Sequence, residues 1–141
     1  MTLLVVYLTA ASVAILLWVV SLRRNEVSFV DILWPVLHVI PATQMLIIAS
    51  PNASVPWTTF LTYLLLFVWA TRLTTHLANR AAGATEDSRY VDIRNNNEPG
   101  FRYKSVYIIF GLQSFLACTI SLLFLPIAHG ESWSNLLFSI G

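Results

Sequence analysis

Four long apolar stretches constrain this chain more than any other feature of its sequence. The first, residues 3–22, contains no charged side chain. A helix of that length rises about 1.5 Å per residue and just crosses a hydrocarbon core of about 30 Å. We therefore expect an all-α fold, a polytopic membrane helix bundle with about four transmembrane helices in a single domain over residues 1–141. The predicted helices cover residues 3–22, 27–50, 57–79 and 105–128.

The composition agrees with a chain that lies in a lipid bilayer. Hydrophobic residues make up 57% of the sequence and charged residues only 11%, whereas soluble domains carry about 25% charged residues. A net charge of +1 provides no basic field to attract nucleic acid, so we expect no nucleic-acid partner. A cleaved signal peptide would place positive charge before its apolar run, but Arg23 and Arg24 follow the first stretch.

All eight lysine and arginine residues fall on one predicted side of the membrane. Arg23 and Arg24 lie between the first two helices, and the other six lie at the end of the third helix, in the loop 80–104, or at its border with the fourth. The loop between the second and third helices and the C-terminal residues contain none. Because basic loops face the cytoplasm, we predict an N-terminus outside and a cytoplasmic loop 80–104. The membrane would be a bacterial inner membrane or the endoplasmic reticulum.

The second helix contains an acidic residue at or near membrane depth. Asp31, Trp34, Pro35 and His38 share one helix face. An ionisable residue in a membrane indicates a functional site by default. An equally good interpretation is that Asp31 lies at headgroup level, where it caps the helix or pairs with an arginine. For His38 we expect a hydrogen-bonded structural role.

The third helix contains a cationic stripe. Trp69, Arg72, His76 and Arg80 follow one another along a single face, over about 16 Å. Two arginines and an imidazole in this arrangement are suited to phosphate groups. The alternative is that these side chains merely extend toward anionic lipid headgroups. We favour a functional role for Arg72, which lies deepest, and leave Arg80 open.

The cytoplasmic loop predicts a short surface helix over residues 85–94, with Thr85 as its cap and Arg94 in its last turn. Asn95 to Asn97 and the Pro99–Gly100 pair are expected to end it. On composition alone, its mixed charges are those of a solvated face. No phosphate-binding or dinucleotide-binding glycine motif is present, and the three histidines are too dispersed for a metal site.

Several motifs together resemble the steroid 5-alpha-reductase-like membrane proteins, specifically the DUF1295 group. Their order and spacing match from Ser28 to about Pro126. The motifs are Ser28–Pro35 (SFVDILWP), Trp69–Leu73 (WATRL) with His76 and Arg80, Glu86–Tyr90 (EDSRY) with Arg94, and Phe101 with Leu112–Gln113.

This resemblance implies an NADPH-dependent reductase of about seven helices that acts on an enone-type double bond in a lipophilic substrate. It implies that Asp31 and Trp34 line the substrate cavity and that Glu86 and Asp87 organise the cytoplasmic loop. The residues expected on the cofactor side are Arg72, His76, Arg80, Glu86, Asp87, Arg89, Tyr90 and Arg94.

The sequence departs from this family at its C-terminal end. Family members continue into further helices with an Arg-His-Pro-Asn-Tyr-like segment for the cofactor, whereas this chain stops after Leu136–Gly141. We therefore expect a truncated or split form, inactive alone, with a second chain that supplies the missing helices. Two alternatives stay open: a small four-helix exporter that uses Asp31, and a non-catalytic membrane subunit or remnant. Small and polar residues of the fourth helix suit contacts with another helix: Gln113, Ser114, Cys118, Thr119 and Ser121.

Overall fold

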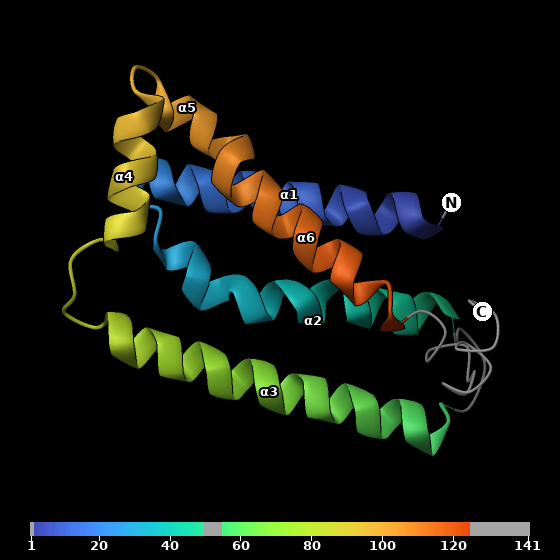
Figure 1. Cartoon of the computed structure of the whole chain (residues 1–141). Helices are drawn as coiled ribbons and strands as arrows, with labels where there is room; N and C mark the ends of the chain where they lie inside the picture. Colours follow the sequence, from blue (N-terminus) through green and yellow to red (C-terminus); the bar gives the residue numbers. More distant parts are fainter. Residues whose placement is uncertain (1, 50–54, 125–141) are drawn as a thin grey trace, which may run out of the picture.

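The computed structural model describes residues 2–49 and 55–124. Within these ranges the regular structure is entirely helical (Figure 1). The elements are α1 (Thr2–Arg24), α2 (Phe29–Ala49), α3 (Trp57–Ala81), α4 (Ser88–Asn97), α5 (Phe101–Ser105), the π-helical segment η1 (Val106–Gly111) and α6 (Leu112–Ser121).

Four of the described helices are long and apolar enough to cross a membrane, which confirms the predicted membrane bundle. They cover Leu3–Arg24, Phe29–Ile48, Trp57–Ala81 and Phe101–Ser121. The last of these runs through α5, η1 and α6. It begins four residues before the predicted start at residue 105 and ends at Ser121. The end predicted at residue 128 lies outside the described residues.

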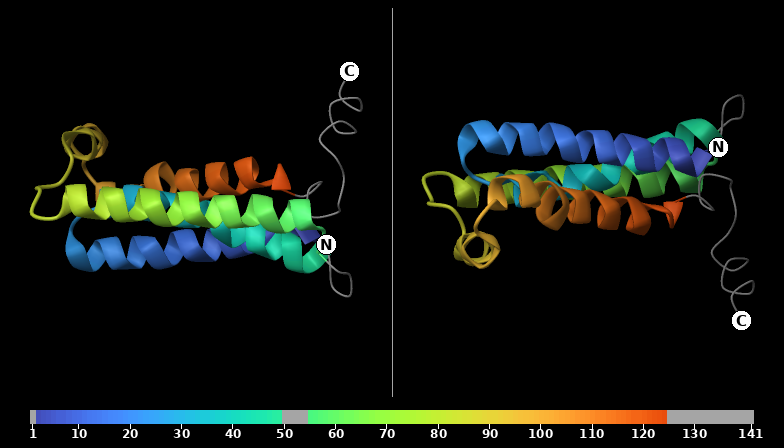
Figure 2. Two further views of the ribbon diagram at one scale, coloured as in Figure 1. Left: turned by 90° about the horizontal axis from the view of Figure 1, so that it is seen from below. Right: turned by 90° about the horizontal axis from the view of Figure 1, so that it is seen from above.

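The helices meet in an arrangement centred on α2, which contacts α1, α3 and α6. Figure 2 shows α3 running along the bundle, while α4 lies across one end of it. A core cluster beneath α4 joins residues of α1, α2, α4, α5 and η1, among them Val30, Tyr90 and Phe110. In contrast, α3 buries only Thr59 and Ala70. Most of its apolar surface is therefore available to acyl chains or to other helices.

One end of the bundle collects the basic residues. The C-termini of α1 and α3, the N-terminus of α2, and both α4 and α5 lie at this end (Figure 1). Every lysine and arginine lies in these segments or within the last turns of α3. The segregation of charge predicted from the sequence is thus present in the fold. That this end faces the cytoplasm still rests on the positive-inside rule and stays a prediction.

The surface helix α4 begins and ends later than predicted. Thr85 is not its cap; the Asp87 carboxylate accepts the Arg89 backbone N–H at 3.0 Å and caps a helix that starts at Ser88. The asparagines at 95–97 continue the helix, because the Asn97 side-chain amide donates to the Ile93 carbonyl at 2.8 Å. The helix stops before Pro99. Gly100, at φ 93°, provides the left-handed turn into α5.

Candidate functional site

A cleft of about 740 Å³ opens at the basic end of the bundle. Its inner wall comes from α2 and α6 and includes Asp31, Ile32, Trp34 and Gln113. Its outer wall, from the end of α3 and residues 84–89, combines charged side chains with Leu77 and alanines. The lining residues are Ser28, Asp31, Ile32, Trp34, Leu77, Arg80, Ala81, Ala84, Thr85, Glu86, Asp87, Ser88, Arg89 and Gln113. Such a volume is typical of small-molecule sites. The combination of apolar and charged side chains suits an amphipathic ligand.

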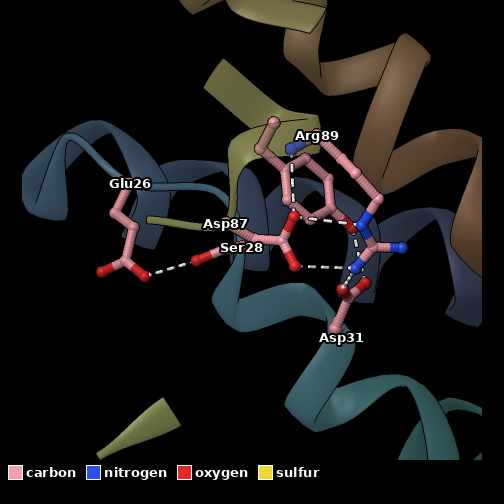
Figure 3. A network of polar contacts seen from close by, with 6 residues as sticks. Glu26, Ser28, Asp31, Asp87 and Arg89 are labelled. Carbon is pink, nitrogen blue, oxygen red and sulfur yellow. Dashed lines mark hydrogen bonds and ion pairs between the residues drawn. The ribbon is translucent and has the colours of Figure 1, made fainter. Parts of the chain in front are cut away.

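A bridged ion pair connects α4 to α2 at this cleft (Figure 3). Arg89 Nη2 lies 3.0 Å from Asp31 Oδ2 and 3.0 Å from Asp87 Oδ2, and Arg89 Nε donates to Asp87 Oδ1 at 3.0 Å. The second oxygen of Asp31 accepts the Tyr90 hydroxyl at 2.5 Å. Both oxygens of Asp31 are therefore occupied by groups from α4.

A second ion pair holds the other side of the segment before α4. Arg94 Nη2 donates to Glu86 Oε1 and Oε2 at 2.8 and 2.7 Å. Glu86 Oε1 also accepts the backbone N–H of Val27 at 2.9 Å, and Arg94 reaches the Asn25 carbonyl at 3.3 Å. The guanidinium carbon of Arg94 lies 5.1 Å from the centroid of the Phe101 ring. Glu86 thus connects the segment before α4 to the turn between α1 and α2.

These contacts shift the pKa values of groups at the surface of the cleft. The Arg89 side chain, then the Arg89 backbone N–H, lower the pKa of Asp87 from 3.8 to about 2. The hydrogen bond with Asp87, then the charges of Asp87 and Asp31, raise the pKa of Arg89. Burial, and next the hydrogen bond to Asp31, raise the pKa of Tyr90. At neutral pH the network contains an ionised Asp87, a cationic Arg89 and a neutral Tyr90 phenol.

The cleft brings together six of the predicted site residues. These are Asp31, Trp34, Arg80, Glu86, Asp87 and Arg89. Tyr90 and Arg94 do not line it but hold its residues through hydrogen bonds. Arg72 and His76 are exposed on α3 and lie outside the cleft.

The predicted stripe on α3 divides into two environments. All four residues are exposed, but the Trp69 ring also contacts the His38 ring, with centroids 5.8 Å apart, whereas Arg72, His76 and Arg80 make no contact of this kind. The buried His38 ring also meets Trp34 edge-on at 4.3 Å, and its Nδ1 lies 3.0 Å from the Trp34 carbonyl oxygen. These contacts agree with the structural role expected for His38.

The sequence motifs contained cleft residues to which no binding role was assigned, and Gln113 is the one that lies in α6. Gln113 belonged to a family motif and to the polar residues of the fourth helix, and it lines the inner wall. The other residues of that polar group contact the chain itself, since Ser114, Cys118 and Ser121 are buried and Thr119 hydrogen-bonds the Phe115 carbonyl. Among the described residues, no group of three or more His, Cys, Asp or Glu side chains is placed to hold a metal ion.

Comparison with known proteins gives one match. The family model described as "Protein of unknown function (DUF1295)" matches residues 17–139. No curated protein and no solved structure matches the chain.

Proposed function

This chain belongs to the DUF1295 family, and we propose that it forms the substrate-binding part of an NADPH-dependent membrane reductase. The substrate is a lipophilic molecule with an enone-type double bond. The observation that carries the proposal is the cleft at the basic end, where Ile32 and Trp34 face charged groups of residues 80–89. A reductase of this kind requires both an apolar site for its acceptor and polar groups for a water-soluble cofactor.

The exposed side of α3 contains basic side chains that are suited to bind a phosphate-bearing cofactor. Arg72, His76 and Arg80 are spaced four residues apart, about 6 Å along the helix axis. In the described part of the chain none of the three has a hydrogen-bond or ion-pair partner. Unpaired basic side chains of this kind fit the phosphates of NADPH, which supplies a hydride when bound. We therefore assign phosphate binding to Arg72 and His76, which lie outside the cleft, whereas Arg80 lines the cleft beside its carboxylates.

The other predicted cofactor residues have a different role in this proposal. The guanidinium groups of Arg89 and Arg94 are already paired with carboxylates of the chain. We propose that they position residues 84–90 against α2, with Glu86, Asp87 and Tyr90 as their partners. A phosphate brought directly against Asp31, Glu86 and Asp87 would meet three carboxylates, which is unfavourable.

The chemistry proposed for the cleft follows from the needs of enone reduction. A hydride adds to the β-carbon, the electron pair of the double bond moves to the carbonyl oxygen, and a proton then reaches the α-carbon. The protein must hold the acceptor, exclude water and donate a hydrogen bond to the oxygen that gains charge. Asp31 is not suited to that donation, because it already accepts from Arg89 and Tyr90. We assign it a positioning role.

The exposed face of α3 favours the expected second chain as a binding partner. Arg72 lies nine residues before the end of α3, about 13 Å along the helix, and is exposed on a membrane-spanning helix. An uncompensated arginine at that depth is costly. We propose that further helices, supplied by a second membrane chain, cover this face and complete the cofactor site. Co-purification of such a chain with the full-length protein tests this part.

The proposed reductase accounts for the contacts better than the two alternatives. A proton-coupled exporter needs an acidic residue free to exchange protons, whereas Asp31 is bonded through both oxygens. A subunit that associates through the small residues of its fourth helix needs them on the surface, whereas Ser114, Cys118 and Ser121 are buried.

The decisive experiment measures enone reduction by the full-length protein in native membranes, together with whatever membrane chain co-purifies with it. We expect NADPH consumption that depends on a long-chain enone, and a product that has gained two hydrogen atoms by mass spectrometry. The matched saturated ketone should give no consumption. If the enone is recovered unchanged with NADPH present, the proposed function is wrong.

A further inference from the structure

The carboxylates of the cleft are already paired within the chain. Asp31 and Asp87 bind Arg89, and Glu86 binds Arg94. The Ser28 hydroxyl donates to Glu26 Oε1 at 2.6 Å. A ligand that enters the cleft therefore meets the remaining polar groups: Arg80, Thr85 and Ser88 on the outer wall, and Trp34 and Gln113 on the inner wall.

On the inner wall two polar groups have no hydrogen-bond partner among the described residues. They are the side-chain amide of Gln113 and the indole N–H of Trp34. The Trp34 ring is fixed by its edge-on contact with His38 at 4.3 Å. Gln113 is half-buried and lines the cleft from α6. It lies twelve residues into the Phe101–Ser121 span, about 18 Å along the helix, where an unpaired amide is costly.

The π-helical segment η1 sets the direction in which Gln113 points. A π-turn contains one residue more than an α-turn, so it rotates the following helix relative to the preceding one. The segment ends at Gly111, where a Cβ atom would lie 3.0 Å from the Val106 carbonyl oxygen. Gly111 permits this close approach, and Gln113 follows two residues later. Single π-turns of this kind are frequent at functional sites.

From these observations, and resting on the proposed function, we infer that the Gln113 amide binds the carbonyl oxygen of a neutral lipophilic substrate in this cleft. A primary amide donates to a carbonyl without carrying a charge, so it selects an uncharged polar head. The neighbouring Ile32 and Trp34 side chains offer apolar surface to the carbon skeleton. The cleft is lined by three carboxylates, Asp31, Glu86 and Asp87, against two arginines, Arg80 and Arg89, which disfavours an anionic head group.

The test reads the hydrogen bond directly and needs no turnover. A long-chain enone labelled with ¹³C at its carbonyl is added without NADPH to the full-length protein in nanodiscs, and the carbonyl band is recorded by infrared difference spectroscopy. We expect a band shifted to lower frequency by hydrogen bonding. Gln113→Leu should remove the shifted band and weaken enone binding by about threefold to tenfold, the effect of one neutral hydrogen bond.

Two further variants keep the test specific. Gln44→Leu alters the other glutamine, which donates to Thr9 at 2.8 Å outside the cleft, and should retain the shifted band. Trp34→Phe should also retain it. The inference is overturned if the band persists in Gln113→Leu, if Trp34→Phe alone removes it, or if the wild type shows none. A shifted band that depends on Gln113, without any NADPH-dependent reduction, would support the binding site and reject only the reductase.

Discussion

Tyr90 on α4 donates a hydrogen bond of 2.5 Å to Asp31 on α2, and this contact connects the surface helix to the membrane-spanning bundle. Tyr90 is buried in the core cluster at the basic end, together with Val30 and Phe110. Its position is therefore fixed by packing as well as by the hydrogen bond. The place of α4 and the environment of Asp31 depend on one another through this pair.

Replacement of Tyr90 by phenylalanine should separate these two contributions. Tyr90→Phe keeps the buried ring but leaves one oxygen of Asp31 without its donor. We expect the free energy of unfolding to fall by roughly 1.5–3 kcal/mol, the effect of a hydrogen bond to a charged group. Denaturation of the full-length protein in detergent, followed by tryptophan fluorescence, measures it. Tyr103→Phe is the matched control, since Tyr103 is exposed. Equal stability of the two variants would contradict this account.

The Glu86–Arg94 pair should hold the segment before α4 against the bundle. Arg94→Gln removes the contact of Arg94 Nη2 with both oxygens of Glu86 and leaves a carboxylate that is only 17% exposed. We expect proteolytic cleavage within residues 82–87 to accelerate roughly tenfold or more, because local opening becomes easier. Limited proteolysis with mass spectrometry locates the cleavage. Arg102→Gln, a change at an exposed arginine, should leave the rate unchanged. A similar acceleration in both variants would argue against the pair.

The ion pair of Asp87 with Arg89 should make α4 sensitive to acid. The pKa of Asp87 is lowered to about 2 by Arg89, from an ordinary value of 3.8. A lowered pKa in the folded state means that the carboxylate stabilises the fold above about pH 4. This contribution is lost as the pH falls toward 2. Asp87→Asn should therefore lower the Tm at neutral pH, and its difference from the wild type should disappear between about pH 4 and 2. A difference that is constant over this range would refute the assignment.

The membrane-spanning helices were predictable because each depends on a local pattern. An uncharged run such as residues 3–22 has no other stable arrangement, and the charges at its end fix where it stops. Pairing with an arginine was one of the two interpretations of Asp31. The structure identifies that arginine as Arg89, 58 residues away along the chain. Nothing local in the sequence specifies which of the basic residues folds back onto α2.

The contacts of the site were harder to predict where they depend on a small rotation of a side chain about its helix axis. Trp69 and Arg72 lie on one predicted stripe, yet three residues along a helix leave about 60° between them. That angle is enough for Trp69 to contact His38 while Arg72 makes no hydrogen bond or ion pair with α2. The π-turn before Gln113 changes the helical phase in a way that no periodic pattern reveals. Similarly, Thr85 and Asp87 are both suitable caps, and only the contact to Arg89 selects Asp87.

Arg72 provides the sharpest test of the proposed cofactor face. Arg72→Gln removes a cation with no partner in the described part of the chain, so it should leave insertion and folding intact. We expect NADPH to bind about tenfold to a hundredfold more weakly, because a charge-assisted hydrogen bond is lost. Equilibrium dialysis with the full-length protein and its co-purifying chain measures this. Thr75→Ala changes a neighbouring exposed side chain and should have no effect. Unchanged NADPH affinity in Arg72→Gln would reject the assignment.

Gly111 connects the geometry of the fourth spanning helix to the cleft. Gly111→Ala places a Cβ atom 3.0 Å from the Val106 carbonyl oxygen, and this backbone atom has to move to accommodate it. We expect a loss of stability of about 1 kcal/mol or more, together with a rotation of Gln113 away from the inner wall. Thermal denaturation measures the first effect, and the ¹³C carbonyl band of the bound enone measures the second. Leu112→Ala, at an exposed neighbouring position, should retain the band. If Gly111→Ala retains both its stability and the shifted band, the π-turn does not position Gln113.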